Sequence, residues 1–164
     1  KVFIDGDSYS KELVDYIPYT DIFVASEFVY RGMFDNDHYE ENCSNIMALG
    51  PEIVVFTFGE KGAVGISAEG FFSIPAYDVN VVDTVGAGDD FHGAFLAGLL
   101  KPGWSVKFIT QFASAVSAIK CTRIGGRAGI PNMETTLRFM ETGHIDYTEI
   151  NRRVEYYKRR IDYV

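Results

Sequence analysis

Cysteine and histidine are scarce and scattered in this chain. Its 164 residues hold two cysteines, Cys43 and Cys121, which lie far apart, and the histidines are His38, His92 and His144. A structural zinc site needs more ligands at close spacing, and no Cys-x-x-Cys pair occurs. Two widely separated thiols are more typical of free cysteines in a reducing compartment than of a disulfide.

Long apolar runs and excess positive charge are also missing. No stretch approaches the roughly 18–20 apolar residues of a membrane span, and the start of the chain lacks a signal-peptide pattern. There are 15 Lys and Arg against 23 Asp and Glu, a net charge of −8. We therefore expect a cytoplasmic protein that binds neither membranes nor nucleic acid, because nucleic-acid affinity depends on basic side chains. Phosphorylated small molecules stay open as ligands, since backbone amides can hold them.

The composition is otherwise that of a globular protein. Hydrophobic residues make up 47%, aromatic residues 15% and charged residues 23%, which excludes wholesale disorder. A length of 164 residues allows one domain, so we expect a single domain over residues 1–164. Because Lys1 is followed at once by a strand-like segment, we expect the chain to be a fragment of a longer protein.

Strand and helix patterns alternate along the chain. The expected strands cover residues 1–5, 21–25 and 53–58, followed by a hairpin of 63–68 and 71–75. The expected helices cover about 10–16, with Ser8 or Ser10 as its cap, and 37–48, 88–100, 105–121, 133–141 and 147–159. The helix at 88–100 is apolar on all sides, which predicts burial, and the last helix is charged, which is typical of a solvated face. This order predicts an α/β fold, a mostly parallel sheet with helices on both faces.

A glycine turn is the most informative segment. The sequence Asp83-Thr84-Val85-Gly86-Ala87-Gly88-Asp89 joins a strand-like stretch at 79–82 to the helix expected from residue 88. Gly86 and Gly88 remove side chains where the backbone would approach a ligand, and the helix start offers unpaired N–H groups. This predicts an anion site, with Asp89 as a general base beside it. From spacing alone, an aspartate at 89 or 90 that only complements the helix N-terminus is an equally good interpretation.

Two other phosphate-binding motifs are missing. No Gly-Lys-Ser/Thr sequence occurs, which excludes a Walker A loop. A G-x-G-x-x-G turn that starts at Gly86 would need Gly or Ala where Phe91 stands. Neither P-loop nor Rossmann dinucleotide binding is therefore supported.

The glycine turn resembles the D-T-x-G-A-G-D motif of PfkB/ribokinase-type carbohydrate kinases. Three further segments are similar to that family in the same order: Thr57–Gly62 to its T-x-G-x-x-G nucleotide turn, Phe112–Ala115 to the helix that passes the adenine, and Cys121–Pro131 to the following loop. The resemblance covers nearly the whole chain and is weakest at the last helix. It implies a three-layer ribokinase-like sandwich, truncated here at the N-terminus.

The resemblance implies a reaction and the residues that carry it. The family transfers the γ-phosphoryl group of ATP to a sugar hydroxyl, with Mg²⁺. Asp89 would take the proton from the acceptor hydroxyl. The backbone amides of Gly86, Ala87 and Gly88 would stabilise the charge that develops on the transferred group, in line with the electrostatic demands of phosphoryl transfer.

The resemblance also implies contacts to the nucleotide and to a cation. Thr57, Gly59 and Gly62 would lie along ATP. Ser114 and the glycine-rich loop 125–129, which includes Gly126, would border the adenine. The backbone at Asp83 and Val85 would hold a monovalent cation such as K⁺.

The sequence departs from the family pattern at several positions. Ser26 and Val29 stand where the family has the Asn and Glu of N-x-x-E, with Glu27 two positions out of register, and Tyr9 replaces an Arg. We expect altered phosphate handling. The family's sugar-binding residues lie in an N-terminal half that is absent here, so we expect the chain alone to be inactive. A nucleoside kinase of the same family and a non-catalytic nucleotide-binding module stay open as alternatives, as does a homo-oligomer.

Overall fold

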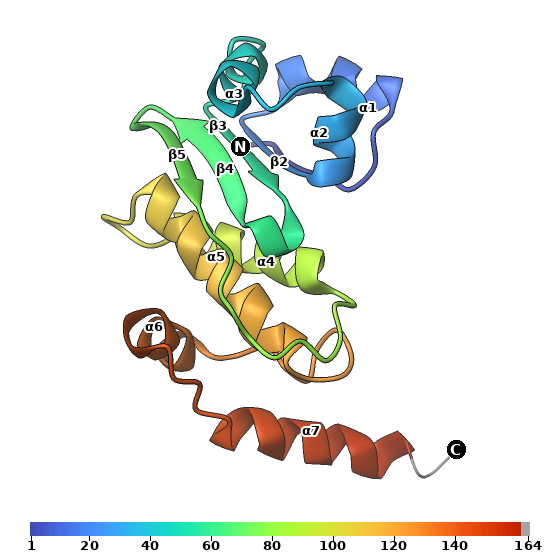
Figure 1. The fold of residues 1–164 in the computed structure, drawn as a ribbon, viewed down its shortest axis with the longest axis vertical. Coiled ribbons are helices and arrows are strands. Elements are labelled where there is room, and N and C mark those ends of the chain that lie inside the picture. The colour runs from blue at the N-terminus through green and yellow to red at the C-terminus, as the bar shows by residue number, and fades with distance from the viewer. Residues whose placement is uncertain (162–164) are drawn as a thin grey trace. The chain divides into compact units, whose positions relative to one another are not determined.

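Five strands form one sheet in the computed structural model, which describes residues 1–161 (Figure 1). The strands are β1 (Phe3–Gly6), β2 (Ile22–Ser26), β3 (Ile53–Thr57), β4 (Ala63–Ser67) and β5 (Gly70–Ile74), in that spatial order. β1, β2 and β3 pair in parallel, whereas β4 is antiparallel to β3 and to β5. Four of the five strands therefore run in one direction, which confirms a mostly parallel sheet with a terminal hairpin.

The chain divides into two compact units. The first comprises residues 1–76 with 105–107, and the second comprises residues 77–104 with the chain from 108 onward. The prediction of a single domain over 1–164 stays a prediction. Within residues 1–161, each helix is too short or too polar to cross a bilayer.

Three helices and two short 3-10 helices accompany the sheet in the first unit. They are α1 (Lys11–Tyr16), η1 (Ile17–Tyr19), α2 (Glu27–Met33), α3 (Tyr39–Met47) and η2 (Gly59–Lys61). The Ser10 hydroxyl accepts the Leu13 amide at 3.1 Å and caps α1, so Ser10 rather than Ser8 is the cap. The sequence prediction missed α2, because this helix begins directly after β2 with no turn residue between them.

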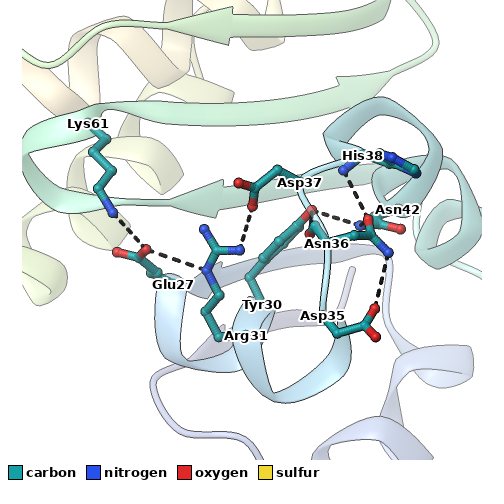
Figure 2. A network of polar contacts seen from close by, with 9 residues as sticks. All are labelled: Glu27, Tyr30, Arg31, Asp35, Asn36, Asp37, His38, Asn42 and Lys61. Carbon is teal, nitrogen blue, oxygen red and sulfur yellow. Dashed lines mark hydrogen bonds and ion pairs between the residues drawn. The ribbon is translucent and has the colours of Figure 1, made fainter.

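An aromatic cluster forms the core of the first unit. Phe23 and Ala25 of β2 and Phe56 of β3 lie on one face of the sheet and pack in one buried cluster with Tyr30. The Tyr30 ring centroid lies 5.0 Å from that of Phe56. Its hydroxyl is 2.7 Å from Asn42 Nδ2, which donates to it, and 3.1 Å from the Asn36 carbonyl oxygen, to which it donates (Figure 2). This pairing satisfies the polar end of a side chain that is fully buried.

Four helices make up the second unit. They are α4 (Ala87–Leu99), α5 (Val106–Cys121, of which the first two residues belong to the first unit), α6 (Met133–Thr142) and α7 (Thr148–Ile161). Ala115 and Ile119 of α5, Phe139 of α6 and Ile150 of α7 share one buried cluster. These helix bounds lie within one or two residues of the expected ones, because caps and breakers mark their ends.

Two expectations for this unit are wrong. Residues 79–82 form no strand, since the amides of Val82 and Asp83 donate to the Cys121 carbonyl at the end of α5 rather than to a sheet. Helix α4 is not buried on all sides, because Leu96 remains 42% exposed. The small residues of α4 instead permit close approach: a Cβ at Gly98 would lie 2.8 Å from Ile109 Cγ2.

Candidate active site

The turn before α4 is anchored by the carboxylate of Asp83. Its Oδ1 accepts the Val85 amide at 2.9 Å, and its Oδ2 accepts the Gly125 amide at 2.7 Å. These two hydrogen bonds, and secondarily the Lys120 charge, hold the pKa of Asp83 below its usual range. One side chain thus joins the 83–86 turn to the glycine-rich loop that follows α5.

Gly86 gives the turn its shape. Its φ of 77° lies in the left-handed region, and a Cβ there would stand 3.0 Å from Gly126 Cα. Gly86 is also the N-cap of α4, and no side chain caps the helix start. Two loops predicted to contact the nucleotide therefore meet, and glycine at 86 permits both the conformation and the approach.

The start of α4 keeps backbone donors available. The Ala87 amide donates to Thr84 O at 3.0 Å and the Asp90 amide to Gly86 O at 2.9 Å. Within residues 1–161, the amides of Gly88 and Asp89 have no protein acceptor. A Cβ at Gly88 would meet nothing within 4 Å. The helix start thus offers unpaired N–H groups and open space, which suits an anion.

Helix α5 supports the turn with two side chains that the sequence prediction missed. Lys120 is fully buried, and its Nζ donates to Asp83 O at 3.0 Å and to Val85 O. Ser117, one turn earlier on α5, donates to Ala87 O at 2.7 Å. The sequence could have placed Lys120 on the buried face of α5, because it stands seven positions after Ala113 and four after Val116. Both of these apolar residues are buried in the structure.

The two aspartates at the start of α4 have different surroundings. Asp89 is exposed, so its carboxylate is accessible to a substrate. Asp90 is half-buried, and its Oδ2 has no hydrogen-bond partner among residues 1–161. Burial raises the pKa of Asp90 to about 6, opposed by Lys120 and assisted by the Asp89 charge. The exposed position of Asp89 suits proton transfer better than that of Asp90.

Helix α7 holds the glycine-rich loop through arginine. Arg153 Nε donates to Ala128 O at 3.3 Å, and its Nη2 donates to Ile130 O. Arg123 donates to Asn151 Oδ1 at 3.1 and 2.9 Å, and its guanidinium lies 3.9 Å from the Tyr147 ring centroid. The expected solvated face of the last helix is confirmed by the exposed residues Glu149, Arg152, Glu155, Lys158 and Arg159. Arg153 is the exception, because it is half-buried and donates to the loop.

The predicted turn in the first unit is built differently. Thr57 ends β3 half-buried, and its hydroxyl lies 3.5 Å from Ala25 O. Gly59 and Gly62 have φ values of 56° and 96°, and a Cβ at Gly62 would stand 2.0 Å from Ile74 O. Lys61 Nζ contacts Glu27 Oε1 at 3.0 Å (Figure 2). Glycine is therefore required at 62, where the turn presses on the end of β5.

The departures from the family pattern also have definite surroundings. Val29 is fully buried in the aromatic core, so no carboxylate stands at that position. Glu27 starts α2 and also pairs with Arg31 at 3.6 Å, and Arg31 pairs with Asp37 (Figure 2). No cluster of three or more His, Cys, Asp or Glu side chains suited to a metal occurs in the part of the chain that is described.

The structure therefore brings some of the predicted residues together. Asp83, Val85, Gly86 and Gly126 meet around one turn, and Asp89 follows on α4. Ser114 lies half-buried on α5, one turn before Ser117. Thr57, Gly59 and Gly62 belong to the first unit and form a turn of their own.

Comparison with known proteins gives consistent matches. The family model described as pfkB family carbohydrate kinase matches residues 2–133. The ATP-dependent 6-phosphofructokinase of Thermoanaerobacterium thermosaccharolyticum is 33% identical over 131 residues, which cover 80% of this chain and 39% of that protein. The chain thus spans well under two thirds of the relative's length.

Solved structures show the same fold. A protein assigned as ribokinase II from E. coli, in complex with ATP and Mg²⁺, is 27% identical with a TM-score of 0.70, covering 85% of this chain and 48% of that one. Aminoimidazole riboside kinase from Salmonella enterica, complexed with aminoimidazole riboside and an ATP analogue, is 26% identical with a TM-score of 0.63, covering 85% and 52%. The predicted ribokinase-like fold class is confirmed.

Proposed function

Because this chain belongs to the pfkB family of carbohydrate kinases, we propose that it supplies the nucleotide-binding part and the general base of an ATP-dependent sugar kinase. The observation that carries the proposal is the start of α4. It combines a left-handed Gly86, unpaired amides at Gly88 and Asp89, and open space at Gly88. An acidic residue at an anion site needs a function to offset the charge repulsion, and proton transfer is such a function.

The proposed chemistry assigns one task to each part of the turn. Asp89 accepts the proton of the sugar hydroxyl as that oxygen attacks the γ-phosphorus of ATP, and the bond from the γ-phosphorus to the β–γ bridging oxygen breaks to release ADP. The amides of Gly86 and Gly88 donate to the phosphoryl oxygens, on which charge accumulates. The Ala87 amide already donates to Thr84 O, so its contribution is to hold the turn in shape.

The remaining predicted contacts are proposals of the same kind. Thr57, Gly59 and Gly62 would contact ATP, and Ser114 and Gly126 would border its adenine. Mg²⁺ would accompany ATP and neutralise phosphate charge, as the pairing of ATP with Mg²⁺ in the E. coli relative supports. The residues that hold the sugar are proposed to lie outside these 164 residues, since the chain spans 39% of the phosphofructokinase.

Exchange of Asp89 for asparagine in the complete protein tests the general base. Asp89→Asn keeps the size of the side chain and removes its basicity, so kcat should fall about 10²–10⁴-fold with little change in ATP affinity. Asp90→Asn is the matched control, because it removes the neighbouring carboxylate and should leave kcat within a few-fold of wild type. Wild-type kcat in Asp89→Asn, or the larger loss in Asp90→Asn, would refute the assignment.

Two other functions are distinguishable in the same assay. A nucleoside kinase is favoured by the likeness to the riboside kinase, and a panel of sugars and ribosides would identify it by acceptor-dependent ADP release. A non-catalytic nucleotide-binding module is favoured by the buried Val29 in place of a glutamate. ATP binding without turnover on any acceptor would support that module.

A further inference from the structure

Lys120 is a buried cation that is bound by backbone carbonyls. The side chain is fully buried on α5, and its Nζ donates to Asp83 O at 3.0 Å and to Val85 O. Lysine is rarely buried to this extent unless it is paired, because its charge loses hydration. Two carbonyl oxygens that converge on Nζ compensate for that loss. The Asp83 carboxylate adds to this, since the charge of Lys120 helps to lower the pKa of Asp83.

These carbonyls are the ones predicted to hold a monovalent cation. Proteins bind alkali cations with sets of backbone carbonyl oxygens that replace the hydration shell. A K⁺ ion in contact with both Asp83 O and Val85 O would have to stand where the ammonium stands, because both oxygens are directed at Nζ. The residues present therefore do not fit a separate monovalent cation at this place.

The ammonium also determines which way the turn presents its amides. In a trans peptide the C=O and N–H groups point in opposite directions, and no cis peptide occurs in residues 1–161. Since Val85 O faces Lys120, the Gly86 N–H of the same peptide points away from α5. Ala87 O accepts from Ser117 at 2.7 Å, and the Gly88 N–H likewise points away from it. The Gly86 and Gly88 amides are therefore both directed away from α5, whereas the Ala87 amide between them donates to Thr84 O. Two backbone donors directed to one side suit an anion.

We infer that Lys120 is a built-in counter-ion of the turn 83–88, which orients its amides and makes a monovalent cation at Asp83 and Val85 unnecessary. Lys120 is a positioning residue: it contacts the turn and acts on the phosphate through the Gly86 and Gly88 amides. The identity of the anion rests on the proposed function. The exclusion of K⁺ rests only on the contacts of Lys120.

The test compares cations and side chains in the complete protein. Melting temperature and Kd for ATP with Mg²⁺ are measured in KCl and in tetramethylammonium chloride at equal ionic strength. Wild type should show no K⁺-specific change in either. Lys120→Met fills the same space without charge and should weaken ATP binding roughly tenfold or more in both salts. Lys120→Ala leaves room for an ion, and K⁺ should raise its melting temperature and restore part of its ATP affinity.

Ser117→Ala is the control for structural damage. It removes another hydrogen bond from α5 to the same turn but no charge, so it should not acquire K⁺ dependence. A K⁺-specific rise in wild-type melting temperature or affinity would overturn the inference, as would wild-type ATP affinity in Lys120→Met. If the Lys120 variants do not fold, the wild-type comparison alone decides. Absence of sugar-dependent turnover would refute the kinase proposal and leave the melting result for Lys120 intact.

Discussion

The two glycine turns of this chain are fixed in different ways. Residues 58–62 are held by their own backbone, with the Phe58 amide donating to Gly62 O at 2.8 Å and the Gly62 amide to Gly59 O at 3.1 Å. Residues 83–87 are held by side chains, two of which come from α5. A turn held by its backbone depends mainly on glycine at the right positions, whereas a turn held by side chains depends on residues distant in the sequence.

The largest expected effect is at the backbone-held turn. Gly62→Ala places a Cβ 2.0 Å from Ile74 O at a φ of 96°, and overpacking together with the left-handed backbone should cost about 3 kcal/mol or more. Gly59→Ala also has a positive φ, of 56°, but its Cβ meets nothing within 4 Å, so about 1–2 kcal/mol is expected. Urea unfolding measures both. Equal losses of unfolding free energy in the two variants would show that the backbone at Ile74 moves to make room and that the close contact does not fix this turn.

The difference between the turns also explains what the sequence could predict. Gly86 was singled out by the local sequence pattern, because glycine marks positive φ and close approach directly, whereas Gly59 and Gly62 were named through the family resemblance. Helix ends were predicted well for the same local reason, as at Ser10, one of the two serines expected to cap α1.

What the sequence could not show is long-range pairing. Lys120, Ser117 and Arg153 act on carbonyls 23 to 37 positions away, and the sequence around such a side chain carries no local signature of so distant a partner. The strand expected at residues 79–82 did not form, because β-branched residues raise strand propensity without specifying a pairing partner, and Val81 and Val82 remain 55% and 53% exposed. Helix spacing alone left Asp89 and Asp90 open, and the choice of Asp89 came from the family resemblance. The structure adds that Asp89 is exposed and Asp90 half-buried.

At the turn of residues 83–87, which is held by side chains, Asp83→Asn should destabilise the protein more than its control Asp146→Asn does. Each carboxylate oxygen of Asp83 accepts a different amide, and asparagine keeps one acceptor while placing an NH₂ group against the other donor. The melting temperature should fall by several degrees. Asp146→Asn is the control, since Asp146 accepts the Thr148 amide through one oxygen and asparagine can replace it there. An equal fall in both variants would mean that loss of charge alone is responsible.

The next largest effect is a gain in stability that depends on pH, and it is expected at Asp90. Burial raises the pKa of Asp90 to about 6 from its ordinary value of 3.8, so between these two pH values the folded protein holds a proton that the unfolded chain has lost. Asp90 therefore disfavours folding increasingly as the pH rises through this window, and its cost is complete above about pH 6. Asp90→Asn should stabilise the protein at pH 7 by on the order of 1 kcal/mol, a value reduced by solvent screening.

Thermal melting of Asp90→Asn and wild type across pH 4–7 tests this expectation. The two melting temperatures should converge near pH 4, where both forms of residue 90 are neutral, and separate as the pH rises. Asp89→Asn provides the comparison at the same helix start, because its carboxylate is exposed. A difference that is constant with pH would show that the Asp90 carboxyl does not titrate in this range.

The smallest effect is expected where the backbone-held turn also has an ion pair. Lys61 contacts Glu27 at 3.0 Å, and Lys61 is 62% exposed (Figure 2). An exposed pair contributes about 0.2–1 kcal/mol, and salt screens it. Glu27→Gln should therefore lower the free energy of unfolding by less than 1 kcal/mol in low salt, and the loss should shrink at 1 M NaCl.

Glu60→Gln removes a neighbouring charge that has no ion pair among residues 1–161 and should show no such salt dependence. A large, salt-independent loss for Glu27→Gln would mean that side chains hold this turn as well, and the contrast between the two turns would then fail.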